Sequence, residues 1–212
     1  MSIGIIGSGA LGSNLARAFA KKGISAIIST RRGPESLASL IAEVGPSIKA
    51  GTVEEAASAD IVIVAVRWES IEEALIGLPA WNGRIVVDGT NPVEFLAPDA
   101  PEDPTNPLAA YGIKAIDLGD KQSSEILSTY VPGARVVKAF NHLDVNVLPE
   151  PEVSGGQRVL FYSGDDAEAK ADVSKLINAA GFFAVDLGSL EVGGRLASLP
   201  FGSLSATNFI KI

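Results

Sequence analysis

The sequence contains no cysteine and only one histidine, and aromatic residues make up 6% of its 212 positions. The absence of cysteine excludes disulfides, thiolate nucleophiles and cysteine metal sites. No spacing of histidine and glutamate indicates another kind of metal site, so we expect no bound metal. No apolar run approaches the roughly 18 residues that span a bilayer. The N-terminus lacks the basic segment of a signal peptide. We therefore expect a cytoplasmic protein without a membrane segment or leader.

Acidic residues are absent from the first 34 positions, and Glu35 is the first of the 25 in the chain. Five of the 17 basic residues precede it: Arg17, Lys21, Lys22, Arg31 and Arg32. The net charge of −8 argues against general binding to nucleic acid or to membrane surfaces. Two interpretations of the early basic residues stay open. They are solvated surface residues, or the first βαβ unit binds a small polyanion such as a dinucleotide.

A glycine motif follows the first apolar run of the chain. Ile3–Ile6 has strand character, Gly7, Gly9 and Gly12 form G-x-G-x-x-G, and helical spacing begins at Ala10. In the dinucleotide-binding unit the first glycine permits the tight turn, and the second lets the backbone approach a pyrophosphate. The third lets helix and strand pack closely. The order strand, glycine turn, helix therefore favours a dinucleotide site over a glycine turn without a ligand.

The end of the second predicted strand distinguishes between the two nicotinamide dinucleotides. An NAD site normally has Asp or Glu there, and this carboxylate binds the ribose hydroxyls. Here the sequence reads Thr30-Arg31-Arg32 with no acid nearby. A hydroxyl and guanidinium groups bind a 2′-phosphate, which a carboxylate would repel. The sequence therefore predicts NADP(H); the alternative is a pair of solvated arginines on a turn.

Strand-type and helix-type segments alternate along the chain, which is the pattern of a doubly wound α/β protein. The continuous apolar run Ile61–Val66 is typical of a parallel strand covered on both faces. We expect an α/β NAD(P)-binding Rossmann fold with a mostly parallel sheet of about eight strands. A single compact domain, 1–212, would comprise a dinucleotide-binding core over 1–120 and an extension of the same sheet over 121–212.

Local signals set the bounds of several elements. Pro34 is placed to open a helix, and another helix is expected to begin at Trp68. Thr52 with Glu55 predicts a capping box. Asp165 is expected to cap a helix together with Glu168, and the last strand is expected over Phe182–Val185.

Two segments interrupt the regular pattern. Residues 89–110 contain prolines at 92, 98, 101, 104 and 107, which predicts either a surface excursion or a flap near the site. The apolar, glycine-rich tail from Leu196 to Phe209 covers a site or forms a homodimer contact.

Several sequence blocks resemble the F420-dependent NADP oxidoreductase family, which is itself similar to the NADPH-binding reductase domain of the six-transmembrane metalloreductases. The blocks occur in the family's order and are spread over about two thirds of the chain. They are I-G-I-I-G-S-G-A-L-G-S (3–13), S-T-R-R (29–32), V-I-V-A-V-R-W-E-S (62–70), V-V-D-G-T-N-P (86–92) and P-G-A-R-V-V-K-A-F-N (132–141). The glycine block is shared by many dehydrogenases, whereas the last block is much more specific.

The resemblance implies an NADP whose nicotinamide lies at the carboxyl ends of the strands, where a deazaflavin or flavin ring stacks on it. It also implies a set of contacts. Ser8, Ala10 and Leu11 would lie along the pyrophosphate, and Thr30, Arg31 and Arg32 would hold the 2′-phosphate. Val66, Arg67 and Trp68 would line the nicotinamide side, and Asn91, Ala139 and Asn141 would approach the two rings.

Two positions depart from the family's pattern. Arg67 stands where members often have proline, so it binds an anionic acceptor or reaches into solvent. Asn141 stands where the F420 enzymes have histidine, which weakens the case for F420. His142 is one position along. Asn141 and His142 are the only candidates for a catalytic role, and the alternative for His142 is a structural hydrogen bond. Lys138 and Asp88 are expected to be structural.

The sequence therefore predicts an NADP(H)-dependent oxidoreductase that transfers a hydride between NADPH and F420, FMN or FAD as a small-molecule redox acceptor. Such a transfer needs positioning and exclusion of water more than an acid–base residue. Two alternatives stay open. One is an NADP(H)-binding redox sensor or partner protein without turnover. The other is a reductase of a small imine or carbonyl compound, although such enzymes usually add a long helical domain.

Overall fold

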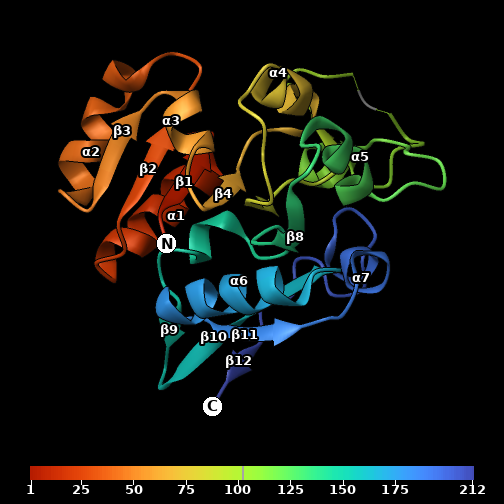
Figure 1. The fold of residues 1–212 in the computed structure, drawn as a ribbon. Coiled ribbons are helices and arrows are strands. Elements are labelled where there is room, and N and C mark those ends of the chain that lie inside the picture. The colour runs from red at the N-terminus through yellow and green to blue at the C-terminus, as the bar shows by residue number, and fades with distance from the viewer. Residues whose placement is uncertain (102) are drawn as a thin grey trace.

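The computed structural model describes residues 1–101 and 103–212 as one mostly parallel sheet with helices on both faces (Figure 1). The strand order is β3-β2-β1-β4-β5-β8-β10-β11, with β9 and β12 pairing alongside β10. The predicted Rossmann-type α/β fold is confirmed. The strands of this sheet are β1 (Ile3–Ile6), β2 (Ala26–Ser29), β3 (Ile48–Gly51), β4 (Ile61–Val64), β5 (Ile85–Asp88), β8 (Arg135–Ala139), β9 (Glu152–Val153), β10 (Gly156–Gly164), β11 (Phe183–Asp186) and β12 (Ile210–Lys211).

Alternate residues of the central strands face opposite layers of helices, because successive side chains of a strand point to opposite faces. In β4, Ile61 and Ile63 pack in one buried cluster, whereas Val62 and Val64 pack in the other. The first cluster contains side chains from α1, α2 and α6, and the second from α3, α4 and α5. The helices are α1 (Ala10–Lys21), α2 (Ala38–Val44), α3 (Val53–Ala57), α4 (Ile71–Leu75), α5 (Ser123–Tyr130), α6 (Ala167–Ala179) and α7 (Arg195–Ala197).

The first residues of the helices follow the local sequence signals, with one correction. The capping box at α3 is present, with Glu55 N donating to Thr52 Oγ1 at 3.2 Å and Thr52 N to Glu55 Oε2 at 2.8 Å. The cap of α6 is Asp166 and not Asp165, because Asp166 Oδ1 accepts from Ala169 N at 2.7 Å. Asp165 instead accepts from the backbone of Leu190.

Three other boundaries differ from expectation. Pro34 opens a 3₁₀ turn (Pro34–Leu37) that leads into α2, so the expected single helix has two parts. Trp68 likewise begins a 3₁₀ turn (Trp68–Ser70) before α4. The strand expected over Phe182–Val185 is β11, but β12 follows it and pairs with β10 through contacts that local sequence does not encode.

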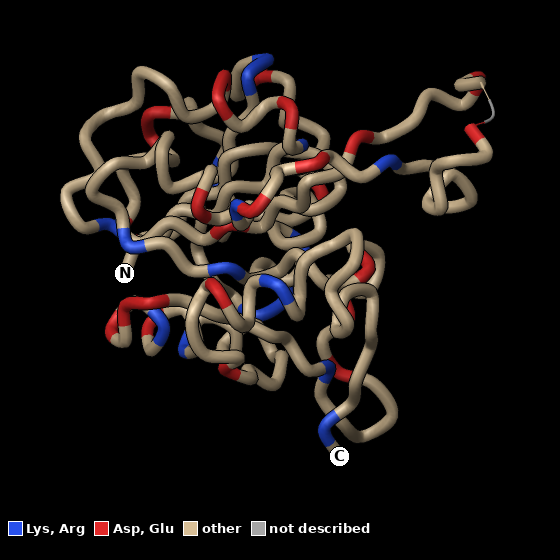
Figure 2. The backbone as a smooth tube through the Cα atoms, turned by 90° about the vertical axis from the view of Figure 1, so that its right-hand side faces the viewer, with Lys and Arg blue, Asp and Glu red and all other residues tan. Residues whose placement is uncertain are grey.

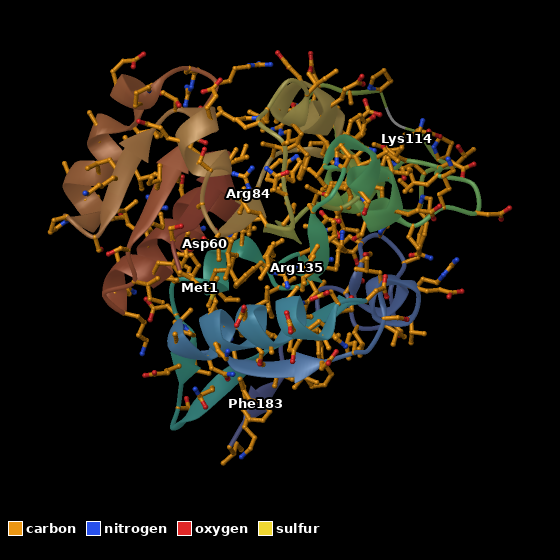
Figure 3. The ribbon with its side chains drawn as sticks, viewed as in Figure 1. Met1, Asp60, Arg84, Lys114, Arg135 and Phe183 are labelled. Atoms are coloured by element: carbon orange, nitrogen blue, oxygen red, sulfur yellow. The ribbon has the colours of Figure 1, made fainter. Side chains whose placement is uncertain are left out.

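The proline-rich segment is not wholly irregular. Its first residues form β6 (Val93–Phe95), which pairs antiparallel with β7 (Ile113–Ala115). The described residues between these strands project from the body of the protein as an arm (Figure 2). Lys114 of β7 lies at the right of the view in Figure 3, on the side of the arm, whereas Asp60 and Met1 lie left of centre.

The C-terminal half continues the same sheet. β8 runs parallel to β5, and β10 then runs antiparallel to β8. Arg135, at the start of β8, lies against α6, where its Nη1 is 3.3 Å from Asp166 Oδ1 (Figure 3). In the part of the chain that the structure describes, no helix has the length and apolar character needed to cross a membrane.

The parallel register brings five loops to one edge of the sheet. Ile6 lies beside Ser29 and Val64, Val64 beside Asp88, and Asp88 beside Lys138. The segments that leave these strands therefore start at one level. Ligands of open α/β sheets bind at this carboxyl edge, and all of the sequence-predicted site residues lie on it or on the segments that leave it.

Candidate functional site

The glycine turn after β1 has the geometry that the motif predicts. A Cβ at Gly7 would lie 2.4 Å from Ala65 O, and one at Gly12 would lie 1.9 Å from Gly7 O. Both glycines are therefore required by packing. A Cβ at Gly9 would meet nothing within 4 Å. Gly9 is thus not needed for this fold, and its open surface fits the close approach of a ligand's phosphate groups.

The first turn of α1 carries a free positive end. Gly9 is the N-cap and provides no side-chain cap, and the first turn contains no acidic residue. Ser13 Oγ donates to Ser8 O at 2.9 Å and holds the turn in shape. Ser8 is half-buried and Ala10 is exposed beside it. The backbone N–H groups and the helix dipole at this end favour an anion.

The residues after β2 present guanidinium groups to solvent. Thr30 is half-buried, and Arg31 and Arg32 are exposed. Arg31 Nη1 forms an ion pair with Glu73 on α4. Both side chains of this pair are largely exposed, so the pair contributes at most about 1 kcal/mol. A bound phosphate could therefore displace Glu73 from Arg31 at little cost.

The segment after β4 places Arg67 beside the arm. The Arg67 guanidinium carbon lies 5.0 Å from the ring centre of Phe95 in β6, and Nη1 is 3.8 Å from Glu69 Oε1. The guanidinium thus lies over Phe95 at the end of β6 where the arm begins, and the Arg67 side chain is 65% exposed. Val66 and Trp68 are half-buried against the core on the α3, α4 and α5 side.

Asn91 and Asn141 come together at the carboxyl ends of β5 and β8. Asn91 Nδ2 donates to Asn141 O at 2.7 Å, and Asn141 Nδ2 donates to Asn91 Oδ1 at 3.1 Å. The same amides hold the C-terminal tail. Asn141 Nδ2 donates to Ala197 O at 3.0 Å, and Leu199 N donates to Asn91 Oδ1 at 3.0 Å. The tail therefore lies on this part of the edge. Asn141 Oδ1 is buried and has no hydrogen-bond partner among the described residues.

His142 is buried and does not face solvent. It is 1% exposed, and among the described residues neither ring nitrogen has a hydrogen-bond partner within normal geometry. Its ring packs on Phe161, with centroids 4.8 Å apart. Burial lowers the pKa of His142 to about 4. The imidazole is therefore neutral at pH 7, and the weak candidacy of His142 as a proton donor finds no support in this geometry.

Phe140, between Ala139 and Asn141, turns the chain at the end of β8. Its φ of 64° is in the left-handed region, which costs a side chain such as phenylalanine free energy. Ala139 is fully buried in the cluster shared with α1 and α6. The strained residue directs the chain so that Asn141 lies against Asn91.

A buried ion pair lies beneath this edge. Lys138 Nζ is 2.9 Å from Asp88 Oδ2, and the two side chains are 1% and 0% exposed. Lys138 also donates to Thr90 O at 2.6 Å and to Ser123 Oγ at 3.0 Å. Asp88 accepts from Thr90 N and Oγ1 and from Ser124 Oγ.

The surroundings of Asp88 keep it ionised. Burial acts to raise the pKa of Asp88, but the Lys138 charge and the hydrogen bonds from Ser124, Thr90 and Lys138 outweigh it and hold that pKa below its usual value. The structural role expected for both residues agrees with this geometry, and Asp88 does bond to the turn that follows it. The sequence analysis did not predict that Asp88 and Lys138 form one hydrogen-bonded network with Ser123. A signal was present, because each of two buried strands contains one charged residue and the two charges are opposite.

Comparison with known proteins agrees with this architecture. Residues 2–92 match the family described as NADP oxidoreductase, coenzyme F420-dependent. A hypothetical protein from Sinorhizobium meliloti is 42% identical, with a TM-score of 0.88 over 100% of this chain and 97% of that chain. A putative F420-dependent NADP-reductase from Arthrobacter sp. FB24 is 26% identical, with a TM-score of 0.65 over 90% and 86%.

A metalloreductase matches this chain over a smaller share of its own length. Metalloreductase STEAP3 of Rattus norvegicus is 30% identical over 201 residues, which are 93% of this chain but 36% of that protein. The chain therefore spans about a third of this curated relative.

Proposed function

We propose that this chain is a member of the family of coenzyme F420-dependent NADP oxidoreductases, and that it transfers a hydride between NADPH and the ring of a deazaflavin or flavin. The observation that carries the proposal is the convergence at one sheet edge of the open Gly9 turn, the basic end of β2 and the Asn91–Asn141 pair. The family and the similarity to a putative F420-dependent NADP-reductase support the choice of acceptor.

Residues of this edge fit the parts of NADP(H). The backbone from Ser8 to Leu11 would bind the pyrophosphate at the start of α1. Thr30, Arg31 and Arg32 would bind the 2′-phosphate, because guanidinium groups form paired hydrogen bonds with phosphate. Val66, Arg67 and Trp68 would line the nicotinamide side. When bound, NADPH supplies a hydride.

Asn91, Asn141 and the tail, at the carboxyl ends of β5 and β8, would hold the nicotinamide and the acceptor ring in position and would exclude water from them. The mutual hydrogen bonds of Asn91 and Asn141 fix both strand ends, and the tail held by them covers this region. Asn141 Oδ1, which has no hydrogen-bond partner in the described part of the chain, is an acceptor that suits an amide N–H group such as that of the nicotinamide. Precise placement of two rings supplies much of the rate enhancement of such a transfer.

The neutral state of His142 favours a ring acceptor over an imine or carbonyl substrate. Reduction of an imine or carbonyl group requires a proton at the substrate, whereas a flavin-type ring can exchange its proton with solvent. The one histidine of the chain is buried and has a pKa of about 4. It therefore does not supply a proton near neutral pH.

A turnover assay tests the proposal. NADPH is mixed with F420, FMN or FAD and the purified protein, and the loss of nicotinamide absorbance is followed. We expect protein-dependent oxidation with at least one of the three. The sensor alternative gives tight NADPH binding without oxidation by any of them, and that result would refute the proposal.

A further inference from the structure

A pocket lies next to the Asn91–Asn141 pair, and the proposed nucleotide contacts do not use it. Its volume is about 330 Å³, within the range of small-molecule sites. Four segments form its walls: the base of the β6–β7 hairpin, the connection from β7 to α5, the start of α5, and the tail. Their lining residues are Pro92 and Ala115, then Ile116, Asp117, Leu118, Lys121 and Gln122, then Ser123, and finally Ser198, Pro200 and Phe201. In Figure 1 these are the green and blue segments around α5 and α7.

The pocket is joined to the carboxyl edge of the sheet by hydrogen bonds. Pro92 directly follows Asn91 in the chain. On the tail side, Ala197 O accepts from Asn141 Nδ2, and Leu199 N donates to Asn91 Oδ1. Both walls nearest the edge are therefore fixed by the two amides proposed to lie beside the nicotinamide. A molecule in the pocket would adjoin that position.

Ser123 gives the pocket a hydrogen-bond donor. Its hydroxyl oxygen accepts from Lys138 Nζ at 3.0 Å, so its own proton must point elsewhere. Lys138 uses its other two protons on Asp88 Oδ2 and Thr90 O. In the described part of the chain the Ser123 hydroxyl donates to no side chain or backbone oxygen, and Ser123 lines the pocket. A molecule in the pocket that reached this hydroxyl would therefore meet a proton that no described group accepts.

We propose that this pocket binds the ring of the hydride acceptor, with the Ser123 hydroxyl donating a hydrogen bond to a carbonyl oxygen or ring nitrogen of a flavin or deazaflavin. This inference rests on the proposed function. In the transfer, a C–H bond of the reduced nicotinamide breaks, and its electron pair and proton move together to the acceptor ring. The ring then carries one more negative charge until solvent supplies a proton.

The buried network makes Ser123 a suitable donor for that charge. A hydrogen bond from the Lys138 ammonium polarises the Ser123 hydroxyl and strengthens the bond that the hydroxyl donates. Donors that are already oriented stabilise a developing negative charge without reorganisation. Lys138 and Asp88 act here through Ser123 and are positioning residues.

The test is equilibrium binding of the fluorescent probes FMN and F420 to the protein without nicotinamide nucleotide. We expect at least one probe to bind, and Ser123→Ala to weaken it roughly three- to tenfold, as expected for loss of one hydrogen bond. Ala115→Phe, which places a ring in the pocket, should weaken binding by more than tenfold. NADPH binding should not change in either variant, and this shows that both variants fold.

Ser128→Ala is the matched control. It removes a hydroxyl from the same helix, but Ser128 Oγ donates to Ser124 O at 2.7 Å and does not line the pocket. Its probe affinity should equal that of the parent protein. Thermal unfolding of each variant provides a second check on folding.

The outcomes separate this inference from the proposed function. If the parent protein binds neither probe, or if both pocket variants bind a probe as tightly as the parent, the pocket assignment is wrong. If those variants bind weakly but the parent protein does not oxidise NADPH, the pocket stands and the proposed function fails. If the parent protein oxidises NADPH and the variants bind the probes unaltered, the proposed function stands and the pocket assignment fails.

Discussion

At the scale of single residues, Gly9 is a position where a substitution should change NADPH binding without changing the stability of the fold. A Cβ at this position meets no protein atom within 4 Å, and its φ of −69° suits any residue. Gly9→Ala should therefore leave the unfolding temperature unchanged but weaken NADPH binding by more than about tenfold, because the methyl group occupies the space needed by the pyrophosphate. Calorimetric titration and thermal unfolding measure the two effects.

Gly12→Ala is the contrasting variant. Its new Cβ would lie 1.9 Å from Gly7 O, so this variant should lose stability as well as affinity. If Gly9→Ala binds NADPH as the parent protein does, the phosphate groups do not lie against this turn.

Arg31 tests the choice of NADP over NAD. Arg31→Ala should weaken NADPH binding by about 1.5–3 kcal/mol, the range for a hydrogen bond to a charged group, and should change NADH binding little. Release of the ion pair with Glu73 reduces this effect only slightly, because both side chains are exposed. The measurement is the pair of dissociation constants, and an equal loss for both nucleotides would refute the assignment of the 2′-phosphate site.

His142 should make stability depend on pH. Its pKa is about 4 in the folded protein against an ordinary value of 6.5, so the unfolded chain binds the proton first as the pH falls. Folding should therefore lose up to about 3 kcal/mol from this group between pH 6.5 and pH 4.

The variant His142→Leu removes that contribution while keeping an apolar side chain of similar size in the site. Urea unfolding at several pH values should show a flatter pH dependence for the variant than for the parent protein over this range. Parallel curves for the two proteins would show that the histidine is protonated equally in both states.

At the scale of elements, the Asp88–Lys138 pair joins β5, β8 and the start of α5. Lys138→Met leaves the Asp88 charge buried without its partner, which should cost about 3–5 kcal/mol of unfolding free energy. Adding Asp88→Asn removes that charge and keeps Oδ1 as the acceptor for Thr90, while the amide nitrogen at the Oδ2 position can donate to Ser124 Oγ. The double variant should therefore be more stable than Lys138→Met alone in urea unfolding. A double variant that loses the sum of the two single effects would contradict this account.

Elements with strong local signals could be predicted, whereas those made by distant contacts could not. The capping box of α3 and the apolar run of β4 are encoded within a few residues, and both are confirmed. The strand β12 pairs with β10 from about 50 positions away, and β6 pairs with β7 across the proline-rich segment. Such pairing depends on the position of the partner strand, which the local sequence does not encode.

At the scale of the whole molecule, the parallel sheet explains why a sequence of separate motifs becomes one site. The glycine turn and Thr30-Arg31-Arg32 were predicted from local patterns, whereas the Val66–Trp68 segment, Asn91 and Asn141 were implied by the family resemblance. The register of β1, β2, β4, β5 and β8 brings their ends to one edge. The contact of the C-terminal tail with this edge was one of two open interpretations, because the sequence does not indicate where an apolar tail folds back.

The match of residues 2–92 to an NADP oxidoreductase family leaves the identity of the hydride acceptor to experiment, and one measurement identifies the acceptor most directly. The protein is mixed anaerobically with equimolar NADPH and F420, FMN or FAD, and the absorbances of nicotinamide and acceptor are followed together. Our account predicts that both decrease in equal amounts for at least one acceptor, and faster with NADPH than with NADH. Tight binding of NADPH while every acceptor stays oxidised would contradict it.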